Sequence, residues 1–499
     1  MSSFIEILQS QFKQSSDRPA VIYHNEIITY LQLKDRAVYV ASLLQEKGLE
    51  TGDRVILYTP DKYAFLIAHL GIILSGGVSL PLNFNFTRNE MNYFLNDSGA
   101  RFAFASGKEA ELIQQIRSEC PHLDEIIDPT VAIRENTIQF REVSIKPEDN
   151  CFILYSSGTT GTPKGVVHTH QNLAASLLDL QKCWRFTEQD VLLNALPLFH
   201  IHGLSFAAHL SLISGSCMML EDKIHPVKTM DKIADATVFM AVPTIYYAFL
   251  RSAEFKEKAK KWKRTRLFTC GSAPIRPEVL PELESILNTS LINRYGMTES
   301  HVITSLPLDG PFPQGSVGRP LKGIDLKLVT EERRSISARA VGEEDRGIVG
   351  EVKIKSENLF SLYWNRPEAT ASEFDDDGYF KTGDLGCFDE YGFLTLVGRK
   401  KDLIITNGFN VYPPVVERVI NSFPQVTESA VIGIPDRRKG EQVVAVVVAE
   451  NDLEIDELKK HCLRNLVDYQ VPTRFELADS LPRNTMGKIL KRELRSSLE

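Results

Sequence analysis

The sequence lacks the features that stabilise secreted proteins or anchor a chain in a membrane. Its seven cysteines are scattered, and none forms a C-x-x-C pair or a Cys/His cluster with the spacing of a zinc site. The most apolar window, residues 65–82, is broken by a histidine, three glycines and a proline, which argues against a membrane-spanning helix. The first fourteen residues lack the basic flank and long apolar run of a signal peptide. We therefore expect a soluble cytoplasmic protein with reduced thiols.

The sequence also lacks an excess of basic residues. It has 57 Lys and Arg against 65 Asp and Glu, which gives a net charge of −8. Proteins that bind nucleic acids normally present a basic face to the phosphates, so we expect no nucleic-acid partner. The 499 residues, 43% of them hydrophobic, are enough for a globular protein of roughly three domains. We expect a monomer or a homodimer.

The order of helical and strand patterns predicts an α/β fold. Helical windows such as residues 30–47 alternate with short apolar runs such as residues 54–58, which predicts helices layered on largely parallel strands. The pattern changes near residue 400, where a charged run is followed by Gly, Asn and Pro and then by a compact series of helices and strands. We predict a large N-terminal domain of layered α/β subdomains, residues 1–400, and a small mobile α+β domain, residues 401–499.

Two apolar runs indicate where ligands bind. Residues 237–242 and 267–270 are predicted to be buried strands, and each is followed by turn residues. Ligands of open α/β sheets gather at the carboxyl ends of such strands. The residues that follow residue 270 are therefore candidates for a binding site.

One stretch, YSSGTTGTPKG at residues 155–165, has the composition of an anion-binding loop. Glycines let backbone N–H groups approach an anion, hydroxyls donate hydrogen bonds, and Lys164 adds positive charge. The stretch is not a P-loop, because Pro163 and Gly165 flank the lysine where that motif needs Gly and Ser or Thr. The residues alone leave two interpretations open, a phosphate loop of another kind and an ordinary turn.

Five further stretches follow this loop along the chain. They are LPLFHIHG at 196–203, CGSAP at 270–274, NRYGMTES at 293–300, YFKTGDLG at 379–386 with GRKKDLI after it, and LPRNTMGK at 481–488. Together with the loop they resemble the acyl-adenylate-forming family, which contains acyl-CoA synthetases, firefly-type luciferases and adenylation domains of peptide synthetases. The resemblance covers nearly the whole chain. It implies an ATP-dependent acid–CoA ligase that forms an acyl-adenylate with release of PPi, and then an acyl-CoA with release of AMP.

The resemblance also assigns ATP and Mg²⁺ to particular residues. The loop is expected to embrace the β- and γ-phosphates through Ser156, Ser157, Gly158, Thr159, Thr160, Gly161, Thr162 and Lys164. The expected adenine slot consists of Gly271, Ser272, Ala273, Pro274, Tyr295, Gly296 and Met297. Asp384 matches the carboxylate that binds the ribose hydroxyls, and Arg399 matches its partner. Thr298 is expected near the phosphates and Glu299 as the Mg²⁺ ligand, because this cation prefers carboxylate and phosphate oxygens.

Members of the family use two orientations of the small domain for their two reactions. Lys488 resembles the lysine that bridges the carboxylate and the α-phosphate during adenylation. Lys401 matches the hinge about which the small domain turns. Rotation is expected to bring Gly408, Phe409 and Asn410 to a tunnel for the pantetheine arm of coenzyme A, so that its thiol attacks the acyl-adenylate.

The chain departs from the family pattern in one run. Val415 stands where a glutamate is usual after the tunnel loop, while the next glutamate, Glu417, is present. This replacement bears on local packing and contacts with coenzyme A, and we expect catalysis to be retained.

Three residues bear on the identity of the acid. His200 matches a family histidine, His202 follows it by two positions, and Arg294 stands at the edge of the expected acyl pocket. Because the planar fork of arginine matches a carboxylate, Arg294 favours an acid with a second carboxylate. The two features resemble the malonyl-CoA synthetase branch and imply malonate or methylmalonate. If Arg294 instead forms a structural ion pair, a short- or medium-chain fatty acid becomes the alternative.

Two other functions stay open at this point. An adenylation enzyme that loads a carrier protein would need a separate carrier, because no phosphopantetheinyl serine motif is visible in the chain. A non-catalytic nucleotide-binding or scaffold protein is disfavoured, because every residue assigned to chemistry is intact.

Overall fold

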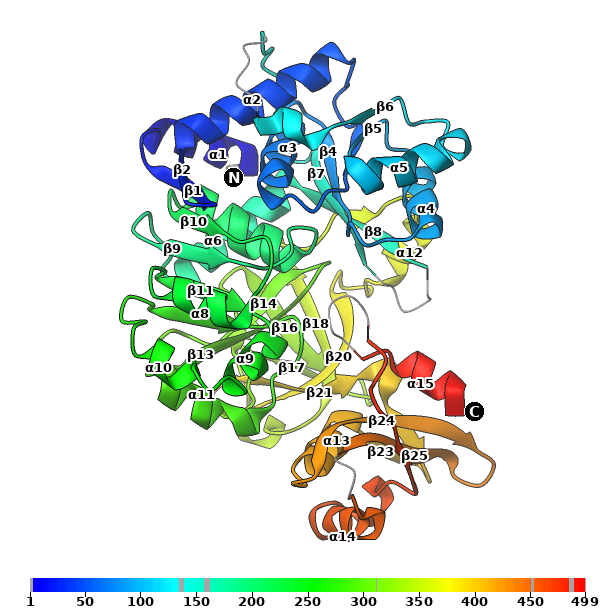
Figure 1. The fold of residues 1–499 in the computed structure, drawn as a ribbon. Helices are drawn as coiled ribbons and strands as arrows, with labels where there is room; N and C mark the ends of the chain where they lie inside the picture. Colours follow the sequence, from blue (N-terminus) through cyan, green and yellow to red (C-terminus); the bar gives the residue numbers. More distant parts are fainter. Residues whose placement is uncertain are drawn as a thin grey trace. The chain divides into compact units, whose positions relative to one another are not determined.

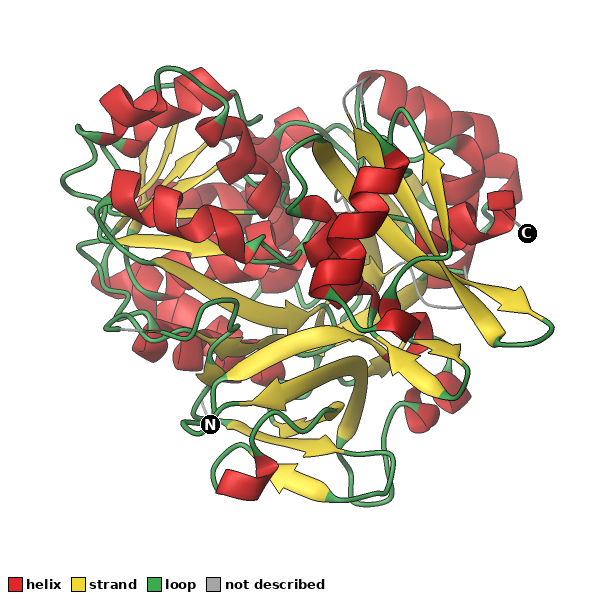
Figure 2. Cartoon of the chain, turned by 90° about the horizontal axis from the view of Figure 1, so that it is seen from below, coloured by secondary structure: helices red, strands yellow, loops and turns green. Residues whose placement is uncertain are grey.

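The computed structural model describes residues 3–133, 139–156, 162–310, 312–449, 453–483 and 489–498. The chain divides into two compact units, each built from several segments (Figure 1). Unit 1 contains Met1–Phe312, Gly318–Asp325 and Lys355–Gly378. Unit 2 contains Pro313–Val317, Leu326–Ile354 and Tyr379–Glu499. Helices and strands are mixed throughout the described residues (Figure 2), which confirms the predicted α/β class.

A seven-stranded sheet forms one part of unit 1. Its strand order is β19 (Leu362–Tyr363), β8 (Lys164–Thr169), β7 (Asn150–Ser156), β4 (Val78–Pro81), β3 (Arg54–Leu57), β5 (Phe102–Phe104) and β6 (Glu125–Ile127). The strands from β7 to β6 are parallel, whereas β8 and β19 are antiparallel additions at one edge. The helices of this part are α2 (Tyr30–Glu46), α3 (Lys62–Leu74), α4 (Arg88–Ser98) and α5 (Gly107–Ile116). The antiparallel edge matters for function, because the predicted phosphate loop connects β7 to β8.

The apolar window of the sequence belongs to this part of the core. Every residue of α3 is buried, and so is every residue of β4, which follows it. A helix that is hydrophobic on all sides is typical of a protein interior as well as of a membrane. No helix within the described ranges is long and apolar enough to cross a membrane.

A nine-stranded sheet forms the other part of unit 1. Its strand order is β15 (Arg319–Pro320), β14 (His301–Ser305), β13 (Leu291–Met297), β12 (Leu267–Cys270), β11 (Val238–Ala241), β9 (Val191–Asn194), β10 (Cys217–Leu220), β1 (Pro19–Tyr23) and β2 (Glu26–Thr29). The strands from β13 to β1 are parallel. The associated helices are α1 (Phe4–Gln14), α6 (His170–Cys183), α7 (Leu210–Ile213), α8 (Pro226–Ile233), α9 (Pro243–Leu250), α10 (Phe255–Ala259) and α11 (Leu280–Leu287). Strands β11 and β12 confirm the two buried strands predicted from the sequence.

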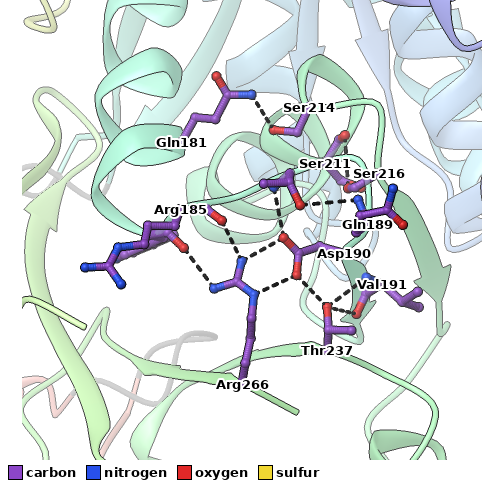
Figure 3. A network of polar contacts seen from close by, with 12 residues as sticks. Gln181, Arg185, Gln189, Asp190, Val191, Ser211, Ser214, Ser216, Thr237 and Arg266 are labelled. Atoms are coloured by element: carbon purple, nitrogen blue, oxygen red, sulfur yellow. Dashed lines mark hydrogen bonds and ion pairs between the residues drawn. The ribbon is translucent and has the colours of Figure 1, made fainter. Parts of the chain in front are cut away.

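An ion pair around the buried carboxylate of Asp190 joins the amino ends of three neighbouring strands in this sheet (Figure 3). Asp190, Thr237 and Arg266 immediately precede β9, β11 and β12. The guanidinium of Arg266 donates to both carboxylate oxygens of Asp190, at 2.9 and 2.7 Å, and the Thr237 hydroxyl donates to the same carboxylate at 2.7 Å. Burial raises the pKa of Asp190, but the bonds from Arg266 and other donors outweigh it and lower that pKa overall. The network fixes the strands at the end opposite to the predicted binding residues.

Unit 2 contains two further sheets. The first has the order β17 (Ser335–Ser337), β16 (Ile324–Val329), β18 (Gly350–Ser356), β20 (Phe380–Phe388) and β21 (Leu394–Arg399). The second has the order β23 (Phe409–Val411), β22 (Ile404–Thr406), β25 (Gly440–Ala449) and β24 (Val426–Asp436), with β26 (Arg474–Leu477) beside β25. The remaining helices are α12 (Pro367–Ser372) in unit 1, and α13 (Pro413–Asn421), α14 (Ile455–Asn465) and α15 (Lys491–Leu498) in unit 2. The domain boundary expected at residue 400 stays a prediction.

Candidate active site

The two ends of the predicted phosphate loop lie opposite each other on antiparallel strands. Ser156 at the end of β7 pairs with Lys164 at the start of β8. The Tyr93 hydroxyl donates to the carbonyl oxygen of Pro163 at 2.6 Å, and the Trp364 amide donates to that of Gly165 at 2.7 Å. The base of the loop is therefore held from two directions. Thr162 is exposed, and the predicted loop residues Ser157, Gly158, Thr159, Thr160 and Gly161 lie outside the described residues.

A buried carboxylate stands beside the base of this loop. Glu299 is 8% exposed. Its Oε1 atom accepts hydrogen bonds from the Ser156 hydroxyl at 3.4 Å and from the Tyr363 hydroxyl at 3.1 Å. Lys164 extends over the same tyrosine, with its Nζ atom 4.6 Å from the ring centroid, and lies 3.4 Å from the Glu373 carboxylate. The structure thus brings Ser156, Lys164 and Glu299 together.

The turn that carries Thr298 and Glu299 is held by its backbone. His168 Nε2 donates to the carbonyl oxygen of Thr298 at 2.9 Å, and the Phe360 amide donates to that of Glu299 at 2.7 Å. Gly296, just before the turn, lies against the carbonyl oxygen of His301, where an added Cβ would overlap that atom. Only glycine fits such a close backbone approach. The short connection from β13 to β14 therefore presents its side chains from a rigid support.

A second group of predicted residues meets around an arginine. Arg294 in β13 donates from Nη2 to the Ser272 hydroxyl at 3.4 Å, and His202 Nδ1 lies 3.2 Å from that same hydroxyl. A Cβ at Gly271 would lie 2.5 Å from Arg294 Nε, so glycine at this position leaves space for the guanidinium. Ala273 and Pro274 continue the turn after β12, and Tyr295 and Met297 complete the end of the adjacent β13.

The guanidinium of Arg294 is buried without a carboxylate partner in the described part of the chain. The residue is 4% exposed, its Nε atom has no hydrogen-bond partner, and its ring contact is with Phe206 at 4.8 Å. Burial lowers the pKa of Arg294 to about 10, so the group stays charged at neutral pH. A buried charge is costly unless it is paired, which makes this group suited to an anionic ligand.

His200 and His202 of the LPLFHIHG stretch are buried and neutral at physiological pH. Burial lowers the pKa of His200 to about 4. Burial, followed by Arg294 and His200, lowers the pKa of His202 well below its usual value. The Nε2 atoms of both are buried without a partner. His202 begins η3 (His202–His209), a π-helix, and π-helical turns are rare and frequent at functional sites.

Unit 2 holds the predicted ribose residues as a cross-strand pair. Asp384 in β20 lies opposite Arg399 in β21, and Arg399 Nε lies 2.9 Å from Asp384 Oδ1. Asp384 is buried, and its amide also donates to the Thr382 hydroxyl at 3.1 Å. The pair is therefore fixed by sheet register. Lys401, the predicted hinge, is exposed in a short 3-10 turn directly after β21.

The predicted tunnel residues form a tight hairpin. Asn407 and Gly408 connect β22 to β23, and both have positive φ angles, 50° and 81°, as a two-residue hairpin turn requires. Phe409 is 52% exposed and stacks on Tyr469 with 4.6 Å between ring centroids. Asn410 donates to the Glu331 carboxylate at 3.1 Å. Lys488 lies outside the described residues.

Two residues beside Glu299 were not predicted from the sequence. Tyr363 and His168 contact Glu299 and Thr298, from which they are separated by 64 and 130 residues along the chain. Neither belongs to a stretch that a single sequence marks as chemical. Their positions depend on pairings of β8, with β7 on one side and β19 on the other.

Family models, related proteins and solved structures match the chain along most of its length. The family model described as "AMP-binding enzyme" matches residues 8–364, and the model of the corresponding C-terminal domain matches residues 415–488. A malonate–CoA ligase of Arabidopsis thaliana is 32% identical, over 100% of this chain and 89% of the relative. A long-chain-fatty-acid–CoA ligase of Yersinia pestis is 31% identical, over 99% and 94%. The crystal structure of ATP-bound MatB from Rhodopseudomonas palustris superposes with a TM-score of 0.91 at 36% identity, over 99% of both chains.

Proposed function

Because the chain belongs to the AMP-binding enzyme family, we propose that it is an AMP-forming acid–CoA ligase whose acid is malonate or methylmalonate. The observation that carries the choice of acid is the buried guanidinium of Arg294, which has no carboxylate partner among the described residues. The similarity to a malonate–CoA ligase supports the same choice. The similarity to long-chain-fatty-acid–CoA ligases makes a monocarboxylate of the fatty acid class the second candidate.

In the first step, a carboxylate oxygen of the acid attacks the α-phosphorus of ATP, and PPi leaves with the electrons of the broken P–O bond. Ser156 and Lys164 supply a hydroxyl and a positive charge at the base of the loop that is assigned to the β- and γ-phosphates. Asp384, held by Arg399, accepts hydrogen bonds from the ribose hydroxyls. Lys488 is assigned to the α-phosphate and the attacking carboxylate by family resemblance.

The surroundings of Glu299 fit a magnesium ion that is shared with phosphates. Among the described residues no group of three His, Cys, Asp or Glu side chains could enclose a metal. Glu299 offers one buried carboxylate with the Ser156 hydroxyl beside it. Mg²⁺ is commonly bound by one or two carboxylates together with substrate phosphates, so this donor set suits it. Mg²⁺ held there would neutralise charge on the triphosphate.

The second carboxylate of a dicarboxylic acid would be held by Arg294 and His202. The guanidinium can donate two parallel hydrogen bonds to one carboxylate. Ser272 lies between the Nη2 atom of Arg294 and the Nδ1 atom of His202. When the Ser272 hydroxyl donates to Nδ1, the proton of the neutral imidazole is on Nε2, which becomes a second donor to the anion. A fatty acid would leave these buried polar groups unpaired, at a cost that disfavours it.

In the second step, the thiol of coenzyme A attacks the carbonyl carbon of the acyl-adenylate, and AMP leaves. We assign the pantetheine arm to the hairpin formed by Gly408, Phe409 and Asn410, and the domain rotation to Lys401.

The seven cysteines are free, and none forms a disulfide. Free thiols support a reducing compartment such as the cytoplasm.

The test is an assay of CoA-dependent AMP release with malonate, methylmalonate, acetate, butyrate, octanoate and benzoate. We expect malonate or methylmalonate to give the highest kcat/KM. Removing the charge with Arg294→Gln should lower that value about a hundredfold or more, because a buried charge pair loses one partner. Arg251→Gln, at an exposed position, is the matched control. Preference for octanoate or butyrate by the wild-type protein would favour the second candidate, and undiminished use of malonate by Arg294→Gln would exclude Arg294 as the residue that recognises the acid.

A further inference from the structure

We infer that Tyr363 is a positioning residue that fixes the Glu299 carboxylate for magnesium binding. This inference rests on the proposed function and deepens it. The Tyr363 hydroxyl donates to Glu299 Oε1 at 3.1 Å, in a contact buried from solvent. The Ser156 hydroxyl reaches the same oxygen at 3.4 Å. With two donors on one oxygen, the plane of the carboxylate is fixed before any cation binds.

Tyr363 is itself held from several sides. It is 4% exposed, and in β19 it pairs with Val166 of β8. Its amide donates to the Thr370 hydroxyl at 2.9 Å, and its ring packs on Phe360 with 4.7 Å between centroids. The Phe360 amide donates to the carbonyl oxygen of Glu299. The same short segment therefore positions both the backbone and the side chain of the predicted metal ligand.

The tyrosine also joins the carboxylate to the predicted phosphate lysine. Lys164 Nζ lies 4.6 Å from the centre of the Tyr363 ring, a distance at which a cation is attracted by an aromatic face. A phenol hydroxyl is a hydrogen-bond donor at physiological pH, because its ordinary pKa is about 10. The ring and the hydroxyl of Tyr363 contact the two groups that are assigned to Mg²⁺ and to the triphosphate.

Partners that orient a metal ligand typically change metal affinity or activity by about 10- to 100-fold when they are removed. Tyr363→Phe removes only the hydroxyl and keeps the ring beneath Lys164. We therefore expect this variant to bind nucleotide about tenfold or more weakly when Mg²⁺ is present, and to bind it unchanged in the presence of a chelator. Because the effect passes through Glu299, it should be less than about twofold in a Glu299→Gln background.

The experiment is isothermal titration calorimetry with α,β-methylene-ATP, whose α,β linkage cannot be cleaved, with Mg²⁺ or with EDTA. Tyr30→Phe is the matched control, because Tyr30 is a buried tyrosine whose hydroxyl donates to the carbonyl oxygen of Ser216 at 2.8 Å and does not contact Glu299. Thermal unfolding of both variants checks that each is folded. The measurement needs no acid, so it does not depend on which acid is the substrate.

The outcomes separate this inference from the proposed function. A tenfold loss in Tyr363→Phe that is absent from Tyr30→Phe and from the Glu299→Gln background would support it. Unchanged Mg²⁺-dependent affinity in Tyr363→Phe, or an equal loss in the Glu299→Gln background, would overturn the inference alone. No Mg²⁺-dependent nucleotide binding by the wild-type protein would overturn both the inference and the proposed function.

Discussion

Unit 1 should lose stability steeply as the pH falls below the ordinary histidine pKa. Three buried histidines show the effect most directly, because burial lowers the pKa of His69 to about 3 and the pKa values of His168 and His170 to about 4. Burial lowers the pKa values of His209 and His301 well below the usual value too. All five stay neutral in the native state at a pH where the unfolded chain is protonated.

The sign and size follow from proton linkage. Below about pH 6.5 the unfolded chain binds protons that the native protein does not, so the free energy of unfolding falls by about 1.4 kcal/mol per pH unit for each histidine. The fall continues until the pH reaches the native pKa. At about pH 5 each of the three histidines with native pKa values of about 3 or 4 costs about 2 kcal/mol, or about 6 kcal/mol together. That is comparable with the whole stability of a typical domain, about 5 to 15 kcal/mol.

The contacts explain why these histidines stay neutral. His69 Nε2 lies 2.8 Å from His209 Nε2, so this pair holds one hydrogen between two nitrogens, and Ser79 lies 2.8 Å from the other nitrogen of His69. His170 is buried, and its Nδ1 has no partner. A second proton on any of these rings would place a charge in a buried site, and on the Nδ1 atom of His170 it would also have no partner.

The assay is urea unfolding between pH 7.5 and 5, followed by tryptophan fluorescence. All three tryptophans, Trp184, Trp262 and Trp364, belong to unit 1, so the signal reports on that unit. His170→Leu should reduce the pH dependence by about 1.4 kcal/mol per pH unit between pH 6 and 5, whereas His122→Gln, at an exposed position, should leave it unchanged. Unfolding free energies that stay constant from pH 7 to 5 would refute the reasoning.

Three further changes probe other parts of the molecule. Lys488→Ala should abolish ATP–PPi exchange but leave thioester formation from supplied acyl-adenylate intact; equal loss of both steps would contradict this assignment. Gly271→Ala should displace the Arg294 guanidinium and raise the KM for malonate with little change in the KM for ATP, as measured by initial rates; an unchanged malonate KM would contradict it. Arg266→Met removes the ion-pair partner of the buried Asp190 carboxylate, which keeps its bonds from Thr237 and Thr187, and should lower the unfolding free energy by about 2 to 3 kcal/mol in urea titrations; a loss under about 1 kcal/mol would show that the pair is not critical.

Sequence patterns predict the elements here better than they predict which side chains meet. The strand at residues 267–270 was predicted from an apolar run, and its parallel pairing with β13 places its carboxyl end beside Asn293. That adjacency is why Ser272 meets Arg294, and His202 joins them from η3. The contact between Tyr363 and Glu299 could not be predicted, because it requires the pairing of a two-residue strand with β8.

The run around Val415 is another place where the sequence does not predict the contacts of a side chain. The sequence shows that one glutamate of the usual run is missing and that Glu417 remains. In the structure Glu417 accepts hydrogen bonds from the Val431 amide at 2.8 Å and from Lys491 at 2.6 Å, so it joins α13 to β24 and α15. The retained glutamate thus has an internal structural role, which the sequence alone did not reveal.

In the nine-stranded sheet, the residues at the amino ends of the strands stabilise the fold, and the proposed acid-binding residues lie toward the opposite ends. At the amino ends of β9, β11 and β12, Asp190, Thr237 and Arg266 satisfy one another's charges and hydrogen bonds. Just beyond the carboxyl end of β12, Arg294 in the middle of β13 is buried with an unsatisfied Nε. An arginine that served only the fold would be expected to be paired, as Arg266 is. Arg266 is partly exposed and still has a carboxylate partner, whereas Arg294 is buried and has none among the described residues, and this contrast favours an anionic ligand as the missing partner of Arg294.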